Sequence, residues 1–176
     1  MRRLAPGILR GASRGSIGLL FFRRQLGQGA QGCFVPLGVE RSVVVEHGVD
    51  LGLHAPMSRL AFRGEAALLN EALSNLLHNA IRHAGEGSHV TLALAADEAR
   101  LRMSVTDDGP GMPPEELQRA GERFFRGGGQ QLPGSGLGLS IARSVAQRHG
   151  GSLRVMPGPE GRGLCVELAL PIDFKG

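Results

Sequence analysis

The chain has 176 residues, about the size of one ordinary domain with room for an extra segment, and its 41% hydrophobic and 20% charged composition is that of a globular protein. Its two cysteines lie far apart with no further ligand at metal spacing, so the sequence favours neither a disulfide framework nor a zinc site and fits a reducing cytoplasm. The formal net charge of +4 comes from an N-terminal group of arginines with few aromatics, and no apolar run approaches the roughly 20 residues that span a bilayer, so we expect neither nucleic-acid binding nor a membrane span.

The chain divides into an irregular N-terminal segment and one ordered domain. Residues 1–38 are rich in Gly and Arg without a helical or alternating period, so we predict that they are irregular or disordered and that the domain covers 39–176. Short strand material around Val49 and Leu51, broken by Gly48 and Gly52, comes first. The elements predicted after it are a helix at 65–84, a strand hairpin at 90–95 and 101–105, a helix start at 113–120, a helix at 138–149, and strands at 152–156 and 163–170. This order predicts an α/β fold, a two-layer sandwich in which helices cover one face of a mixed sheet.

A ridge of polar side chains lies along the first predicted helix. Asn75, Asn79 and His83 are each four residues apart and therefore stack on one helical face, with Arg82 beside them. An Asn carbonyl on a rigid helix can supply one of the few protein oxygens that Mg²⁺ takes alongside waters and phosphates. Taken alone, the ridge fits an ordinary solvated face equally well.

An acidic residue ends the second hairpin strand and opens a glycine-containing run, Asp107-Asp108-Gly109-Pro110-Gly111. A carboxylate is an acceptor only, which suits an amino donor, and Gly109 and Gly111 allow the backbone to approach a flat base closely. Taken alone, an Asp-Gly pair is more often a simple turn.

The stretch from residue 107 to residue 138 is rich in Gly and Pro and long for a loop, and such loops in compact domains tend to be functional. Within it, residues 123–127 read Arg-Phe-Phe-Arg-Gly, which couples two phenylalanines to a cation. Adjacent phenylalanines are by themselves more often part of a core.

A second glycine-rich run opens directly into the helix predicted at 138–149: Gly134-Ser135-Gly136-Leu137-Gly138. Bare backbone N–H groups and the positive end of the helix dipole then face one point, an arrangement that binds phosphate. A dinucleotide-binding turn would need an early strand and an acid about 20 residues further on, and a P-loop would need Gly-Lys-Ser/Thr. The sequence offers neither.

In this order the four segments resemble the N box, the Asp-x-Gly-x-Gly box, the F box and the glycine box of the sensor histidine kinase ATP-binding domain. That domain is part of the GHKL superfamily, with the gyrase, Hsp90 and MutL ATPase domains. The resemblance covers about residues 40–170. It implies the Bergerat-type sandwich with a mostly antiparallel sheet, ATP and Mg²⁺ as ligands, and a lid over about 112–136.

The resemblance also implies roles for single residues. Asn79 would be the magnesium ligand, with Asn75 one turn earlier near the phosphates and metal, and this pair would be the catalytic one. Arg82 would meet phosphate and His83 would lie beside the nucleotide. The remaining roles are adenine recognition by Asp107 with Gly109 and Gly111, lid anchoring by Phe125, a phosphate contact by Arg126, and a phosphate cradle made by Gly134, Ser135, Gly136, Leu137 and Gly138.

The activity implied is transfer of the γ-phosphoryl group of Mg-ATP to a histidine, followed by relay to an Asp of a response regulator. In this family the acceptor belongs to an H box on a dimerisation hairpin, and none of the six histidines matches that pattern. We therefore expect the acceptor on another domain or chain. Two alternatives stay open: a truncated nucleotide-binding regulatory module without kinase activity, and an anti-sigma-type serine kinase with the same fold.

Overall fold

The structure, a computed structural model, describes residues 48–54, 64–120, 122, 125 and 136–172. The segment predicted to be irregular, 1–38, and the predicted domain start at 39 lie outside these residues. None of the helices in the described ranges combines the length and the apolar content needed to cross a membrane.

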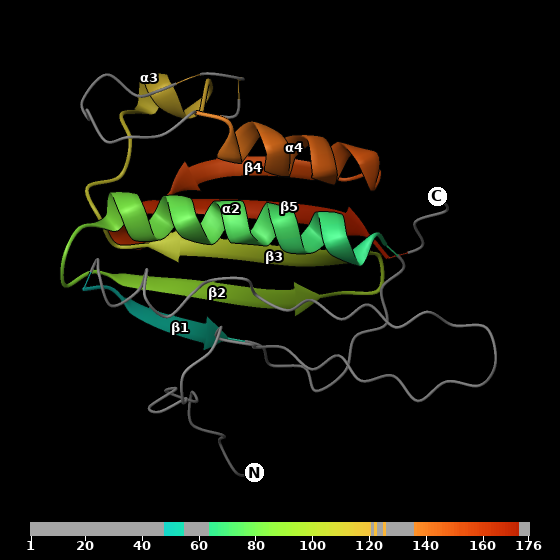
Figure 1. The fold of residues 1–176 in the computed structure, drawn as a ribbon, viewed down its shortest axis with the longest axis horizontal. Coiled ribbons are helices and arrows are strands. Elements are labelled where there is room, and N and C mark those ends of the chain that lie inside the picture. The colour runs from blue at the N-terminus through green and yellow to red at the C-terminus, as the bar shows by residue number, and fades with distance from the viewer. Residues whose placement is uncertain (1–47, 55–63, 121, 123–124, 126–135, 173–176) are drawn as a thin grey trace, which may run out of the picture.

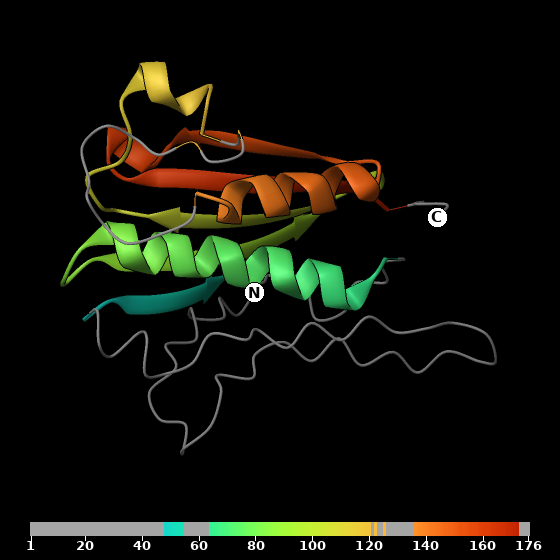
Figure 2. The ribbon, with the colours of Figure 1, turned by 45° about the horizontal axis from the view of Figure 1, so that its top comes forward.

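Five strands form one mixed sheet with the order β1-β2-β3-β5-β4. The parallel pair is β1 with β2, and the other neighbouring pairs are antiparallel. Two helices, α2 (Ala66–Ala84) and α4 (Gly138–Arg148), lie on one face of the sheet (Figures 1 and 2). The predicted two-layer α/β sandwich is confirmed, with strands β1 (Asp50–His54), β2 (His89–Ala96), β3 (Arg100–Asp107), β4 (Ser152–Pro157) and β5 (Leu164–Pro171).

Two local predictions differ from the structure. Gly52 does not break the first strand, because β1 runs through it and pairs it with Thr91. It is an exposed position on a strand that, within the described residues, pairs on one side only, so no side chain is needed there for the core. The helix predicted at 113–120 is only α3 (Pro114–Leu117), since the chain beyond it tightens into turns with bonds between residues three apart.

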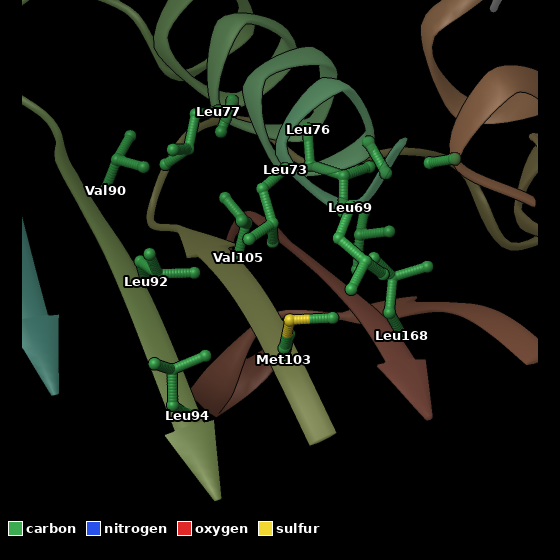
Figure 3. Packing of buried hydrophobic residues seen from close by; sticks show 14 of the residues in the cluster. Leu69, Leu73, Leu76, Leu77, Val90, Leu92, Leu94, Met103, Val105 and Leu168 are labelled. Carbon is green, nitrogen blue, oxygen red and sulfur yellow. The ribbon is translucent and has the colours of Figure 1, made fainter. Parts of the chain in front are cut away.

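The core lies between α2 and the sheet (Figure 3). Apolar residues three and four apart on α2 face inward, and alternate residues of β2 and β3 point toward them. The helical and the strand period of the sequence each place apolar side chains on a buried face. Burying one such leucine fully contributes about 1.5–3 kcal/mol. The helix supplies Leu69, Leu73, Leu76 and Leu77, and the strands supply Val90, Leu92, Leu94, Met103 and Val105.

The end of α4 is fastened to the start of α2. His149 is fully buried, its Nδ1 lies 2.8 Å from the carbonyl oxygen of Val145, and its Nε2 accepts the backbone N–H of Glu65 at 3.0 Å. A neutral ring protonated on Nδ1 satisfies both contacts. On the surface beside it, Arg148 Nε donates to Glu65 Oε1 at 2.5 Å. The two helices therefore run antiparallel, so the start of α4 lies toward the end of α2.

Two glycines end α4. Gly150 takes a φ of 68° and donates to the carbonyl of Gln147, and Gly151 donates to the carbonyl of Ala146. These are the two bonds of a Schellman motif, in which glycine adopts the left-handed conformation at no steric cost. The helix stop read from Gly150 and Gly151 thus agrees with the structure.

Candidate functional site

One end of the molecule, on the left in Figure 1, gathers the segments that the sequence singled out. There α2 and β3 end, α4 begins, and the turn between β4 and β5 lies beside the end of β3. The antiparallel pairs of helices and strands bring these points together from positions far apart in the chain. The site has a strand half around Asp107 and a helix half around Asn79.

Asp107 is the last residue of β3 and is buried, with 6% of its surface exposed. Its Oδ1 accepts the backbone N–H of Gly109 at 3.1 Å and that of Leu164 at 3.3 Å. Burial raises the pKa of Asp107, while the two hydrogen bonds and, more weakly, the charge of His83 act in the lowering direction. Both donors approach the same oxygen, so the carboxylate is held in one orientation.

Glycines surround Asp107 where a side chain has no room. A Cβ on Gly109 would lie 2.6 Å from the Cα of Ala84 at the end of α2, and a Cβ on Gly111 would lie 2.7 Å from the carbonyl oxygen of Gly163. Side-chain carbons do not approach backbone atoms this closely. We expected these glycines to allow approach to a ligand; in the structure they also allow backbone to pack on backbone, which fixes the end of β3.

The helix half joins α2 to the first residue of α4. A Cβ on Gly138 would lie 2.8 Å from Nδ2 of Asn79 and 3.2 Å from its Oδ1, so the Asn79 amide lies directly against the start of α4. One turn earlier, Asn75 Nδ2 donates to the carbonyl of Glu71 at 3.0 Å. This bond uses one of the two N–H groups of the Asn75 amide and does not involve its oxygen.

The start of α4 carries the features of an anion site. Leu137, the N-cap residue, makes no side-chain cap, and no residue in the first turn is acidic. Ser140 Oγ donates to the Leu137 carbonyl rather than accepting a backbone N–H. The first N–H groups of a helix have no partner within it, and together with the dipole they attract negative charge. Gly136 is described here, whereas Gly134 and Ser135 lie outside the described residues.

The predicted lid is described only in part. The guanidinium carbon of Arg119 lies 4.7 Å from the centroid of the Phe125 ring, and Arg119 Nε lies 3.4 Å from Glu122 Oε2. Arg119 thus holds Phe125, a contact that the sequence did not suggest. Arg126 lies outside the described residues, and Arg82 is exposed in the last turn of α2.

The sequence reasoning missed the turn between β4 and β5. Its contributions are the Leu164 N–H on Asp107 and the close fit of Gly163 against the end of β3. Three glycines within residues 158–163 were the available signal, but only the β3–β5 pairing shows what they contact.

Residues 64–173, more than half of the chain, match the family described as histidine kinase-, DNA gyrase B- and HSP90-like ATPases. The chain is 41% identical over 126 residues to the sensor-like histidine kinase SenX3 of Mycobacterium tuberculosis, covering 70% of this chain and 30% of SenX3. It therefore spans about 30% of the length of that curated relative.

Solved structures agree with the sequence matches. The mycobacterial sensor histidine kinase MprB is similar with a TM-score of 0.66 and 32% identity, over 73% of this chain and 88% of that chain. The nucleotide-free catalytic domain of the histidine kinase ThkA has a TM-score of 0.64 and 26% identity, over 75% and 90%. The chain belongs to the family of histidine kinase-, DNA gyrase B- and HSP90-like ATPases, and residues 64–173 are an ATP-binding catalytic domain of the histidine kinase type.

Proposed function

We propose that this domain binds Mg-ATP at the end of the sheet where α2, β3 and α4 meet, and donates the γ-phosphoryl group to a histidine on another domain or chain. The observation that carries the proposal is the pairing of two unlike halves in one place. An oriented, buried carboxylate at the end of β3 suits a base with an amino donor. The uncapped start of α4 against the Asn79 amide suits a triphosphate with its cation.

Asp107 reads the base in this proposal. Its Oδ1 is taken by two backbone donors, so Oδ2 accepts the 6-amino group of adenine. An ionised carboxylate has no donor, and a base that presents a carbonyl oxygen at this position, as guanine does, brings no hydrogen to Oδ2 and places two oxygens against each other. His83, whose charge acts on Asp107, lies beside the nucleotide.

The phosphates lie at the start of α4, where the N–H groups following Gly136 and Leu137 meet them. Within the described residues, no three His, Cys, Asp or Glu side chains gather to hold a metal. A cation here relies on the oxygens of Asn79 and Asn75 together with phosphate oxygens, the sparse oxygen coordination that Mg²⁺ accepts. Bound Mg²⁺ supplies neutralisation of charge on the β- and γ-phosphate oxygens. Arg82, Phe125 and Arg126 complete the proposed phosphate side.

The protein's part in transfer is to bind and orient, because phosphoryl transfer needs the acceptor in line with the γ-phosphorus and little further covalent chemistry. The acceptor proposed is a histidine on a dimerisation domain, and a response regulator aspartate receives the group next. Relatives described as sensor histidine kinases support these partners.

The direct test is incubation of the chain with Mg²⁺ and γ-labelled ATP, with and without a histidine-bearing dimerisation domain from a relative. We expect acid-labile, base-stable label on the added domain, as for phosphohistidine. Bound ATP without transferred label would reduce the function to a nucleotide-binding module. Acid-stable label on serine would favour a serine kinase instead.

The magnesium assignment has its own test in Asn79→Ala. Nucleotide affinity is measured by titration calorimetry with Mg²⁺ and with EDTA, and the variant should lose the gain that Mg²⁺ provides, by about tenfold or more, since a ligand oxygen is removed. Glu71→Ala, an exposed change two turns earlier on α2, is the matched control and should keep that gain. An unchanged Mg²⁺ effect in Asn79→Ala would contradict the metal site.

A further inference from the structure

The turn between β4 and β5 has no part in the function proposed above, yet it packs tightly on the backbone of Asp107, the base-reading residue. It spans residues 158–163 and contains the short helix η1 (Pro159–Gly161). The inference below rests on the proposed role of Asp107.

Two contacts join this turn to Asp107. Leu164, the first residue after the turn, donates its N–H to Asp107 Oδ1 at 3.3 Å. Gly163 lies flat against the strand end, since a Cβ there would be 1.8 Å from the carbonyl oxygen of Asp107 and 2.9 Å from the Cα of Asp108. Gly163 therefore contacts the backbone of Asp107, and the next residue, Leu164, contacts its carboxylate.

The two ends of the turn are bonded to each other. Gly158 donates to the carbonyl of Gly163 at 3.1 Å, and a Cβ on Gly158 would lie 2.0 Å from the carbonyl oxygen of Arg162. The two ends of the turn, at Gly158 and Gly163, therefore cannot separate without breaking this hydrogen bond. Because Gly111 in turn packs on the Gly163 carbonyl, one small backbone cluster sets the place of the carboxylate.

We infer that Gly163 is a positioning residue for nucleotide selection: by lacking a side chain, it lets the β4–β5 turn hold Asp107 with Oδ1 on the Leu164 and Gly109 N–H groups and Oδ2 toward the base. The turn thereby determines preference for a 6-amino purine. Gly163 touches no nucleotide, and its effect passes entirely through Asp107.

A matched pair of glycines in the same turn tests this. Gly163 has a φ of 67° and Gly161 a φ of 74°, so alanine strains the backbone similarly at both. A Cβ on Gly161 meets nothing within 4 Å, whereas one on Gly163 meets the Asp107 carbonyl. Any difference between Gly163→Ala and Gly161→Ala therefore reports the contact with Asp107.

The readout is the ratio of the dissociation constants for inosine triphosphate and ATP, measured for the full chain with Mg²⁺. The two nucleotides share ribose and triphosphate and differ at the 6-position of the base, so a general loss of stability leaves the ratio unchanged. We expect ATP preference in the wild type, a ratio lowered about tenfold or more in Gly163→Ala, and a ratio within about threefold of wild type in Gly161→Ala.

Asp107→Asn separates this inference from the proposed function. Its amide keeps an acceptor for the two N–H groups and turns a donor toward the base, so the ratio should collapse. A collapsed ratio in Asp107→Asn with equal ratios in the two glycine variants would overturn the inference and leave the function standing. No ATP preference in the wild type, or no change in Asp107→Asn, would overturn both.

Hydrogen exchange supplies a second measurement that does not depend on whether Gly163→Ala folds. In Asp107→Ala without nucleotide, the amides of Leu164 and Gly109 should exchange faster because their acceptor is gone. The amides of Ala99 and Arg100, which bond to Asp97 at the far end of the hairpin, are the internal control. Equal protection of the Leu164 amide in both proteins would show that the turn does not hold the carboxylate, and would overturn the inference.

Discussion

The strand half and the helix half of the site are built differently. Around Asp107, backbone packs on backbone, and each glycine faces main-chain atoms of another segment that cannot move independently. At the start of α4, by contrast, the three atoms nearest to a Cβ on Gly138 belong to the amide group of Asn79, a half-buried side-chain end rather than backbone. The strand half is therefore rigid before a ligand arrives, whereas the helix half can adjust to its ligand at little cost in stability.

The difference fits the tasks proposed for the two halves. A base is selected by one hydrogen bond whose direction must be set in advance, because a misplaced acceptor loses the discrimination. Phosphates and a hydrated cation are held by several oxygens and N–H groups, which tolerate small shifts. Substitutions in the two halves should accordingly affect different measurements.

Of the two substitutions that compare the halves, Gly109→Ala and Gly138→Ala, the larger effect expected is the loss of folding stability in Gly109→Ala. The new Cβ meets the backbone of Ala84 at 2.6 Å, so the end of β3 must move away from the end of α2. We expect a loss of about 1–3 kcal/mol in the free energy of unfolding, measured by urea denaturation, as for other overpacked positions. Gly52→Ala, whose Cβ would meet only ordinary contacts from 3.5 Å, is the control and should be neutral or stabilising. Equal losses in both would remove the claim that the strand half is rigid.

Gly138→Ala should change the free energy of unfolding little and weaken Mg²⁺-dependent ATP binding. Alanine favours the helix by up to about 1 kcal/mol, and the Asn79 amide can turn aside, so unfolding should change by less than about 1 kcal/mol. Displacing the amide should still weaken the Mg²⁺-dependent part of ATP affinity about tenfold. Ser144→Ala, an exposed change further along α4, controls for helix propensity. A Gly138→Ala protein that loses stability and keeps the Mg²⁺ effect would reverse the comparison.

The smallest effects expected are the pH dependences that Asp107 gives to folding stability and to ATP affinity, which run in opposite directions. Burial raises its pKa in the folded state, so between the ordinary aspartate pKa and this raised pKa the folded protein holds a proton that the unfolded chain has released. Its contribution to stability is therefore present at low pH and is lost as pH rises through that window. ATP affinity should rise through the same window, because the ionised carboxylate only accepts hydrogen bonds, whereas the protonated carboxyl carries an O–H donor that opposes the amino group of the base.

The comparison of wild type with Asp107→Asn isolates this contribution. Asp97 and Asp108 have lowered pKa values, chiefly because of backbone hydrogen bonds. The stability that they contribute is present at higher pH and is lost as the pH falls. The difference between the two proteins, measured by urea denaturation and by ATP titration over the acidic range, cancels these groups. An ATP affinity with the same pH profile in both proteins would argue against Asp107 as the acceptor.

Much of the fold follows from local patterns. The inward leucines of α2, the alternating residues of β2 and β3, and the Gly150-Gly151 stop of α4 act over a few residues, so the sequence predicts them without knowledge of distant contacts. The predictions failed at Gly52, where a neighbouring strand decides, and after Leu117, where local turns replace the helix. Gly52 continues a strand because β2 pairs with it, and α3 stops early where the chain tightens into turns.

The sequence by itself determined the two long helices, the hairpin of β2 and β3, and the order of the segments that carry polar and glycine residues. Only the tertiary structure decided which atoms meet: Leu164 on Asp107, Gly163 on the end of β3, Asn79 on Gly138, and Glu65 on His149. The physical reason is the separation along the sequence between the residues that interact. A period of 2 or 3.6 residues is written in neighbouring side chains, whereas these four contacts join residues 57, 56, 59 and 84 positions apart and exist only after the sheet and helices have packed.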